Sequence, residues 1–501
     1  MTSPLHSSPE RGEGPAKLVE GPEVRKSTPP SALWAATSPF RGGLLALALT
    51  MLGFPATAQT IAITRGTVAL GDGSDPIPNG TVVIRNGRIA AAGVNVPIPQ
   101  GAQMIDARGK WVTPGIVAGF SRLGLSEVDL SGGLSDDRAA NSPFSAAIDI
   151  APGVDPNGST IPVNRADGVT RAVVAPNTGK SIFAGQGAMI DLGADMDPIT
   201  RARLFQFVEL GESGGNTAGG SRPSAYILFR NALREARELS RYSPAITSAG
   251  TRRPDAVRDQ PIVRNPNESR EYGPDADRSE DVLLTRFDAA ALVPVLRGRQ
   301  YLLVHVERAR DILNVLQLKR EYPGLKPVLV GASEGWLVAD QLAAAGVPVI
   351  ASAVNDLPAS FEQIAATQSN VGRMRDAGVQ VAIGMIDDND TRFLFNERQY
   401  AGNLVALTDV PGASGVRWGE ALAMITSRPA QILGLGNELG SLAKGRRADV
   451  VVWSGDPLDV RSSAEMVLID GVQQPLETRQ TKLRDRYRDI GDSALPEAYQ
   501  R

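Results

Sequence analysis

Short β-type runs of apolar residues lie near both ends of the chain beyond residue 59, and turn residues separate them. Asn86-Gly87 stands between two of these runs, and this pair favours a type I′ hairpin turn. The runs are Ile61–Thr64, Thr81–Ile84, Ile89–Ala91, Ala448–Trp453 and Met466–Gly471. We expect residues 59–114 and 436–475 to form one small β-sandwich domain that encloses a larger insertion.

Within that insertion, residues 115–435, strand-like runs alternate with stretches of helical periodicity. The strand-like runs are Arg171–Ala175, Tyr301–Val304, Pro327–Val330, Val347–Ile350 and Val379–Ile383. The helical stretches are Ser224–Leu239, Ala309–Tyr322 and Gly335–Ala345. This alternation predicts an α/β fold with a parallel sheet, either open or closed into a barrel.

Two further segments have no such periodicity. Residues 243–281 are rich in Arg, Asp and Pro and poor in large apolar side chains, so they predict a long polar surface loop or lid near the barrel mouth. Residues 476–501 follow the last predicted strand, and we interpret them as a C-terminal tail.

The first 58 residues have the pattern of a leader with a signal peptide. Arg41 precedes an apolar stretch that ends at Phe54, which is too short to span a bilayer, and Ala56-Thr57-Ala58 is typical of a cleavage site. The pattern predicts cleavage after Ala58, export to the periplasm, and a mature chain with no membrane span.

Composition excludes several classes of chemistry. The chain of 501 residues has no cysteine, which excludes disulfides, thiolate zinc sites and cysteine nucleophiles. Its net charge is -3 and its basic residues form no long run, so we expect no nucleic-acid partner. It has two histidines, and His6 lies in the leader. Only His305 is left for a site, which excludes mechanisms that need several imidazoles.

Several stretches together resemble the amidohydrolase superfamily, most closely its imidazolonepropionase-like and prolidase-like branch. They are Asp106–Gly115, Asp167–Thr170, Ala184–Ala188, Ala421–Ala430 and Leu439–Val452. The resemblance implies a (β/α)8 TIM-type barrel over residues 115–435, with the small β-sandwich domain built from both ends of the mature chain. It also implies hydrolysis of C–N bonds of cyclic amides or dipeptide-like substrates, with one or two divalent metals of the zinc type.

The family's metal ligands are mostly missing. Phe120 and Arg122 stand where the resemblance places the two histidines of the first barrel strand. His305 matches the histidine of the fifth strand, and Gly331 replaces that of the sixth. Asp387 or Asp388 falls near the aspartate of the eighth strand. A catalytic zinc centre needs at least three protein ligands, so we expect no tight metal and interpret His305 first as a hydrogen-bonded pocket residue.

Two alternatives stay open at this site. An all-oxygen metal site could use Glu212, Asp387, Asp388 and Asp390. Arg122 could instead act as a built-in cation that pairs with Asp387 or Asp388 within reach of His305. If it does not, Arg122 turns toward solvent.

Two short motifs carry weaker signals. Gly331-Ala-Ser333-Glu-Gly335 fits the nucleophile-elbow pattern, but no histidine follows it, so we interpret Ser333 as part of a strand-to-helix turn. Asn177–Ser181 resembles the second half of a phosphate-binding loop, although Val174 replaces its first glycine. We interpret it as the loop after the second barrel strand.

Two functions remain. The first is hydrolysis of C–N bonds with a remodelled or weakly bound metal. The second is a non-catalytic periplasmic barrel, a pseudoenzyme that binds a small-molecule ligand in its mouth, alone, as a homo-oligomer or paired with an active related amidohydrolase.

Overall fold

The computed structural model describes residues 60–127, 135–242, 282–353, 355–386 and 392–488. The expected signal peptide, the polar segment 243–281, and Asp387 and Asp388 lie outside these ranges. In the described part, none of the helices has the length and apolar character that a bilayer crossing requires.

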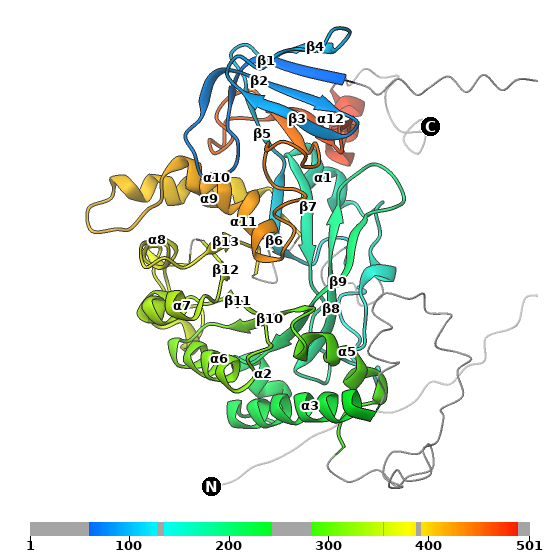
Figure 1. Cartoon of the computed structure of the whole chain (residues 1–501), viewed down its shortest axis with the longest axis vertical. Coiled ribbons are helices and arrows are strands. Elements are labelled where there is room, and N and C mark those ends of the chain that lie inside the picture. Colours follow the sequence, from blue (N-terminus) through cyan, green and yellow to red (C-terminus); the bar gives the residue numbers. More distant parts are fainter. Residues whose placement is uncertain (1–59, 128–134, 243–281, 354, 387–391, 489–501) are drawn as a thin grey trace, which may run out of the picture. The chain divides into compact units, whose positions relative to one another are not determined.

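The strands from the two ends of the chain share one sheet with its own core (Figure 1). Its order is β16-β15-β14-β5-β1-β2-β3, with β4 parallel to β1. Asn86 and Gly87 both have positive φ, 54° and 70°, as the predicted hairpin turn requires. The strands are β1 (Thr60–Val68), β2 (Ile77–Arg85), β3 (Arg88–Gly93), β4 (Gln103–Asp106), β5 (Trp111–Pro114), β14 (Val450–Trp453), β15 (Ala464–Ile469) and β16 (Val472–Gln473).

The insertion forms a second sheet of eight strands, which is nearly closed into a barrel. Its ends meet where the Met385 N–H donates to the Phe120 carbonyl at 3.0 Å. The strands, in spatial and sequence order, are β6 (Ile116–Ser121), β7 (Val169–Val174), β8 (Phe183–Asp191), β9 (Ile199–Glu209), β10 (Tyr301–Val306), β11 (Pro327–Gly331), β12 (Val349–Ala351) and β13 (Val381–Ile383). The predicted fold class, a barrel with an additional sheet from both chain ends, is confirmed.

One strand departs from the all-parallel arrangement. β8 runs antiparallel to both β7 and β9. Residues 192–198 join β8 to β9, and a parallel crossover needs about a dozen residues or more. The connection is therefore too short for any arrangement except an antiparallel pair.

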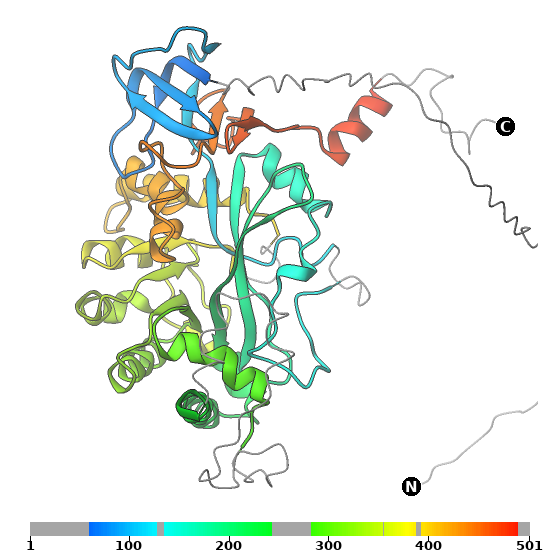
Figure 2. The same cartoon turned by 45° about the vertical axis from the view of Figure 1, so that its right-hand side comes forward.

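Helices cover the outside of this sheet, and Figure 2 shows α6, α7 and α8 in succession beside β10 to β13. The three predicted helical stretches are confirmed as α3, as α6, and as the 3-10 turn η5 followed by α7. The helices and 3-10 turns are η1 (Ala151–Gly153), α1 (Thr160–Ala166), α2 (Glu212–Thr217), α3 (Arg222–Tyr242), α5 (Arg286–Leu296), α6 (Ala309–Glu321), η5 (Gly335–Val338), α7 (Ala339–Ala345), η6 (Phe361–Gln363), α8 (Asn370–Asp376), α9 (Asn396–Ala406), η7 (Leu407–Asp409), α10 (Trp418–Met424), α11 (Ser427–Ile432) and α12 (Arg479–Tyr487).

The barrel interior is a packed apolar core. Inward side chains from its strands meet residues of α11 and of the segment after it in one buried cluster. Members of this cluster include Val117, Phe120, Val173, Met189, Phe205, Phe207, Leu303, Val328, Val330, Ile350, Ala382, Ile432, Leu435 and Leu439. Such filling by branched and aromatic side chains makes the barrel a solid core and no channel.

A buried arginine joins the barrel to the other sheet. Arg171 of β7 is fully buried, and its Nε and Nη2 donate to Asp449 at 2.9 and 3.0 Å. Its guanidinium also donates to Asp470 at 2.8 Å and to Asp191 at 3.2 Å. Burial alone would lower the pKa of Arg171, but the Asp449 carboxylate and its neighbours raise it. Asp449, which directly precedes β14, thus links the two sheets through Arg171.

Candidate functional site

The place that the resemblance gives to the first metal ligand is filled by aromatic packing. The Phe120 ring of β6 lies 5.4 Å from the Phe207 ring of β9, and both side chains are buried. A Cβ on Gly384 would come within 2.8 Å of the Phe120 Cβ, so a glycine is required where the chain leaves β13. Phe120 is therefore a core residue of the barrel and has no donor atom for a metal.

Arg122 follows β6 and is buried, with a relative exposure of 6%. Its guanidinium carbon lies 5.8 Å from the centre of the Phe120 ring, which is within the range of a cation–π contact. The alternative in which Arg122 turns toward solvent is wrong. Its expected partners, Asp387 and Asp388, lie outside the described residues, so that pairing stays a prediction.

His305 lies between two carboxylates. Its Nδ1 is 2.7 Å from Glu209 Oε2, and its Nε2 is 3.1 Å from Glu307 Oε1. The ring is one-fifth exposed (20%), while both carboxylate side chains are buried. Glu209 is the register partner of His305 across the β9–β10 pair, and Glu307 is two residues along the chain. Glu307 directly follows the end of β10, two residues after His305, and its carboxylate reaches the ring from there.

The charges of this cluster support one another. Burial lowers the pKa of His305, but the Glu209 and Glu307 carboxylates together hold it well above its ordinary value. Burial likewise raises the pKa of Glu307, while His305 and the Ser333 amide and hydroxyl bring it below its ordinary value. An imidazolium donates through both nitrogens and has no lone pair for a metal. The raised pKa of His305 and its position between two acidic side chains favour this imidazolium form.

Ser333 belongs to a turn that holds Glu307. The Ser333 N–H donates to Glu307 Oε2 at 2.8 Å, and Ser333 Oγ accepts from Asn355 Nδ2 at 3.2 Å. Gly331 has φ +91°, and a Cβ there would meet Glu307 Oε1 at 2.3 Å. Ala332 has a positive φ of 54°. The turn from Gly331 to Ser333 thus surrounds the buried Glu307 carboxylate. Glu307 forms hydrogen bonds with both His305 and Ser333 and so connects them.

Glu397 of α9 is another buried acid, and it lies near Gly119 of β6. Its side chain is fully buried, and neither of its oxygens forms a well-placed hydrogen bond with the described residues. Burial raises the pKa of Glu397 well above its ordinary value, and the nearby Gly119 backbone N–H lowers it only in part. Burial therefore favours the neutral, protonated form of this carboxyl.

The described residues around His305 do not provide a donor set for a divalent metal. Among the described residues, no group of three or more His, Asp or Glu side chains is arranged to hold a metal ion. Glu212, from the all-oxygen alternative, lies 4.0 Å from Arg222 and is half exposed, and the three aspartates of that set lie outside the described residues. Phe120 is apolar, and both ring nitrogens of His305 face carboxylates.

Sequence reasoning missed Glu209, Glu307 and Glu397. The spacing of two residues between His305, near the end of β10, and Glu307, just beyond it, was a usable signal. Glu209 is close to His305 only because of strand register, which no local pattern encodes. The segment Asn177–Ser181 forms the connection between β7 and β8, as expected, and lines a cavity that is separate from the His305 cluster.

Comparisons with known proteins agree with this fold. Residues 336–474 match the model of the amidohydrolase family. The chain is 25% identical over 403 residues to "Amidohydrolase tasK" of Hapsidospora irregularis, covering 75% of this chain and 38% of that protein. It is 29% identical over 163 residues to a 5-methylthioadenosine/S-adenosylhomocysteine deaminase of Desulforudis audaxviator (strain MP104C), covering 30% of this chain and 37% of that one. The matches therefore span less than two-fifths of either relative.

Among solved structures, an amidohydrolase from Thermotoga maritima MSB8 superposes with a TM-score of 0.68 at 24% identity. The superposition covers 82% of this chain and 99% of that one. At this identity the likeness shows a shared fold. The matched family model and one curated relative are named amidohydrolases, and the other relative is named a deaminase.

Proposed function

The chain carries an amidohydrolase family domain on the fold of that superfamily, and from this premise we propose that its barrel has exchanged the metal centre for a fixed protein cation. In this proposal the protein is a non-catalytic barrel, a pseudoenzyme that binds a small molecule without metal-dependent hydrolysis. The observation that carries it is the bonding of both His305 ring nitrogens to carboxylates.

The physical argument concerns charge. Two buried carboxylates side by side are costly unless a cation lies between them. In a metallohydrolase that cation is the metal, which also activates a water molecule. Here the His305 imidazolium supplies the positive charge and, as a donor at both nitrogens, generates no hydroxide. Arg122, buried beside Phe120, adds a second positive charge near the former ligand positions, and this one is permanent.

A second candidate is hydrolysis of a C–N bond, in a cyclic amide or dipeptide-like substrate, with a weakly held metal. The names of the two curated relatives, an amidohydrolase and a deaminase, favour it. Because each relative is matched over less than two-fifths of its length, their activities reach this chain only as a proposal.

The two candidates differ in metal content and in the effect of His305→Ala. Elemental analysis of the purified full chain, with and without added Zn²⁺, should give metal well below one equivalent, with no metal-dependent turnover of an amide library. In the proposed barrel, His305→Ala lowers stability and leaves the metal content unchanged. Stoichiometric zinc that disappears in His305→Ala, together with zinc-dependent turnover, would overturn the proposal in favour of the hydrolase.

We also propose that the protein is exported to the periplasm after cleavage behind Ala58, and that it assembles with itself or with a related active amidohydrolase. The small-residue pattern Ala56-Thr57-Ala58 supports the first part. N-terminal sequencing of the periplasmic fraction should begin at Gln59. Co-purification of tagged protein from that fraction tests the assembly, and a monomer with no amidohydrolase partner would contradict it.

A further inference from the structure

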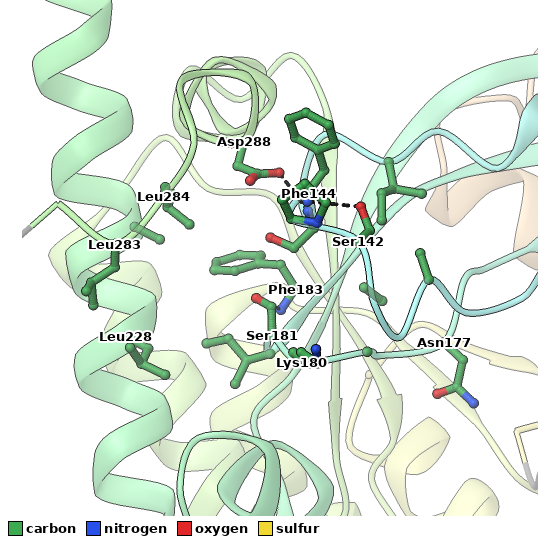
Figure 3. A pocket seen from close by; sticks show the side chains of 18 of the residues that line it. Ser142, Phe144, Asn177, Lys180, Ser181, Phe183, Leu228, Leu283, Leu284 and Asp288 are labelled. Atoms are coloured by element: carbon green, nitrogen blue, oxygen red, sulfur yellow. Dashed lines mark hydrogen bonds between the residues drawn. The ribbon is translucent and has the colours of Figure 1, made fainter.

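A cavity of about 250 Å³ lies beside α3 and the β7–β8 connection (Figure 3). Its lining residues come from α3, the segment that leads into α5 and the first turn of α5, the loop around residues 139–148, the β7–β8 connection and the start of β8. Neither His305 nor Arg122 nor Phe120 lines it. The cavity is therefore separate from the cluster at His305, and its binding properties are independent of the fate of the metal centre.

The cavity has two unlike sides. Figure 3 places Leu228, Leu283 and Leu284 on the side opposite to Ser142 and Asn177. Phe183 extends the apolar side, and its ring stacks on Phe229 of α3 at 5.8 Å. A ligand that fits both sides has an apolar body and one polar end.

The frame of the cavity is preformed by two carboxylates whose hydrogen bonds are satisfied. Asp288 Oδ1 accepts from the Ser145 and Ala147 N–H groups, both at 2.8 Å, and its Oδ2 accepts from Thr285 Oγ1 at 2.6 Å. Glu235 accepts from the backbone N–H groups of Leu283 at 2.8 Å and Leu284 at 3.1 Å. These acids hold the walls in place and are already occupied, so neither is the group that recognises a ligand.

The polar side offers donors. The Ser142 hydroxyl accepts from the Phe144 N–H at 3.0 Å, and the Ser181 hydroxyl accepts from the Phe183 N–H at 3.2 Å. A hydroxyl that already accepts keeps its own hydrogen to donate. Lys180 precedes Ser181 in the β7–β8 connection and is exposed. It has no ion-pair partner in the part of the chain that the structure describes. Two hydroxyl donors and an ammonium complement a group that only accepts, which is a carboxylate.

The rim is apolar and open to solvent. The Phe144 and Phe287 rings meet edge to face at 5.6 Å and are 41% and 66% exposed. Leu283, which lines the cavity, is 61% exposed. A group of exposed apolar side chains around a cavity is typical of a binding site for an apolar group.

We propose that this cavity binds a small monocarboxylate with an apolar body, whose carboxylate faces Lys180 and the Ser142 and Ser181 hydroxyls. Since a cavity of about 150 Å³ holds benzene, 250 Å³ corresponds to roughly ten non-hydrogen atoms. Phenylacetate has this size and chemistry, and phenylacetamide is its neutral counterpart.

The test is calorimetric titration of phenylacetate and phenylacetamide into the full chain and four variants. Phenylacetate should bind saturably, and phenylacetamide about fivefold more weakly, since one partly exposed charge contact contributes about that factor. Lys180→Met should weaken phenylacetate binding by about fivefold and remove the preference over phenylacetamide. Leu283→Asp, which puts a negative charge on the apolar side, should weaken phenylacetate binding at least as much.

Matched controls separate the cavity from general charge effects. Lys444→Met removes an exposed lysine elsewhere, and Ile227→Asp changes an exposed residue of α3 that does not line the cavity. Both should bind phenylacetate as the unaltered chain does. No saturable heat up to about 10 mM, far above the range of specific binding, overturns the proposal. So does equal binding of the two ligands, or binding that survives both Lys180→Met and Leu283→Asp, because the ligand then lies elsewhere.

Discussion

Replacement of Arg171 by methionine tests whether one buried cation holds the two sheets together. The change keeps the apolar stem and removes the guanidinium, which leaves the carboxylates of Asp449, Asp191 and Asp470 without their shared donor. Arg171 has no exposed side-chain surface and Asp449 is 4% exposed, so little water can replace the lost bonds. Breaking a buried pair of this kind costs about 3–5 kcal/mol of the free energy of unfolding.

The assay is urea denaturation followed by tryptophan fluorescence, since Trp453 is buried on β14, the strand that follows Asp449. Arg201→Met is the matched control, because Arg201 bonds Glu438 at 3.0 Å with both side chains about half exposed. An exposed pair contributes about 1 kcal/mol or less. Arg171→Lys should also lose much of the stability, because lysine cannot bond both oxygens of Asp449 at once.

The dependence on pH adds an independent check. Burial raises the pKa of Asp470, but Arg447 and Arg171 bring it below its ordinary value. A carboxyl with a lowered folded pKa stabilises the fold above its unfolded pKa, and this contribution is lost as pH falls. The deficit of Arg171→Met should therefore shrink below about pH 4. Equal losses in Arg171→Met and Arg201→Met, or a deficit that grows in acid, would refute the reasoning.

Three further changes probe the barrel. His305→Gln should lower the free energy of unfolding by about 3 kcal/mol near pH 6, because two buried carboxylates lose their cation. Since the pKa of His305 is raised in the fold, the unaltered chain should lose this contribution as pH rises above about 6.5. Urea titrations of the unaltered chain that show no such decline contradict the assignment. Glu397→Gln should stabilise the protein increasingly above about pH 4.5, because there the unfolded chain ionises this acid while the fold, with its raised pKa, keeps it protonated. A variant that melts at a lower temperature than the unaltered chain at pH 8 would argue for an ionised, paired carboxylate. Gly331→Ala should unfold at a lower temperature than Gly346→Ala, since both residues have positive φ but only Gly331 faces a carboxylate at its Cβ position. Equal melting temperatures of the two variants would count against the role of the turn at Gly331 in holding Glu307.

Local patterns predicted most of the fold because strand and helix periods are local properties. The antiparallel strand β8 was not predicted, because its centre, Gly185-Gln186-Gly187, has low strand propensity. Burial on both of its faces also removes the alternation of apolar and polar residues that marks a strand. The site was predicted less completely. The sequence placed Phe120 and Arg122 where the resemblance puts two histidines, but the hydrogen bonds around His305 depend on the β9–β10 register and on the turn after β11. Both are tertiary relations between segments far apart in the chain.

The sheet made from both chain ends has a consequence for the order of folding. Trp453 Nε1 donates to Thr113 Oγ1 at 2.8 Å across 340 residues, and β14 pairs along the whole of β5. Closing so long a loop has an entropy cost that slows the pairing of β5 with β14. One edge of β5 therefore stays unpaired until the last part of the chain is synthesised. An unpaired apolar edge recruits other strands. A chain cut short before Val450 should therefore aggregate through β5, even though every strand of the barrel is already present.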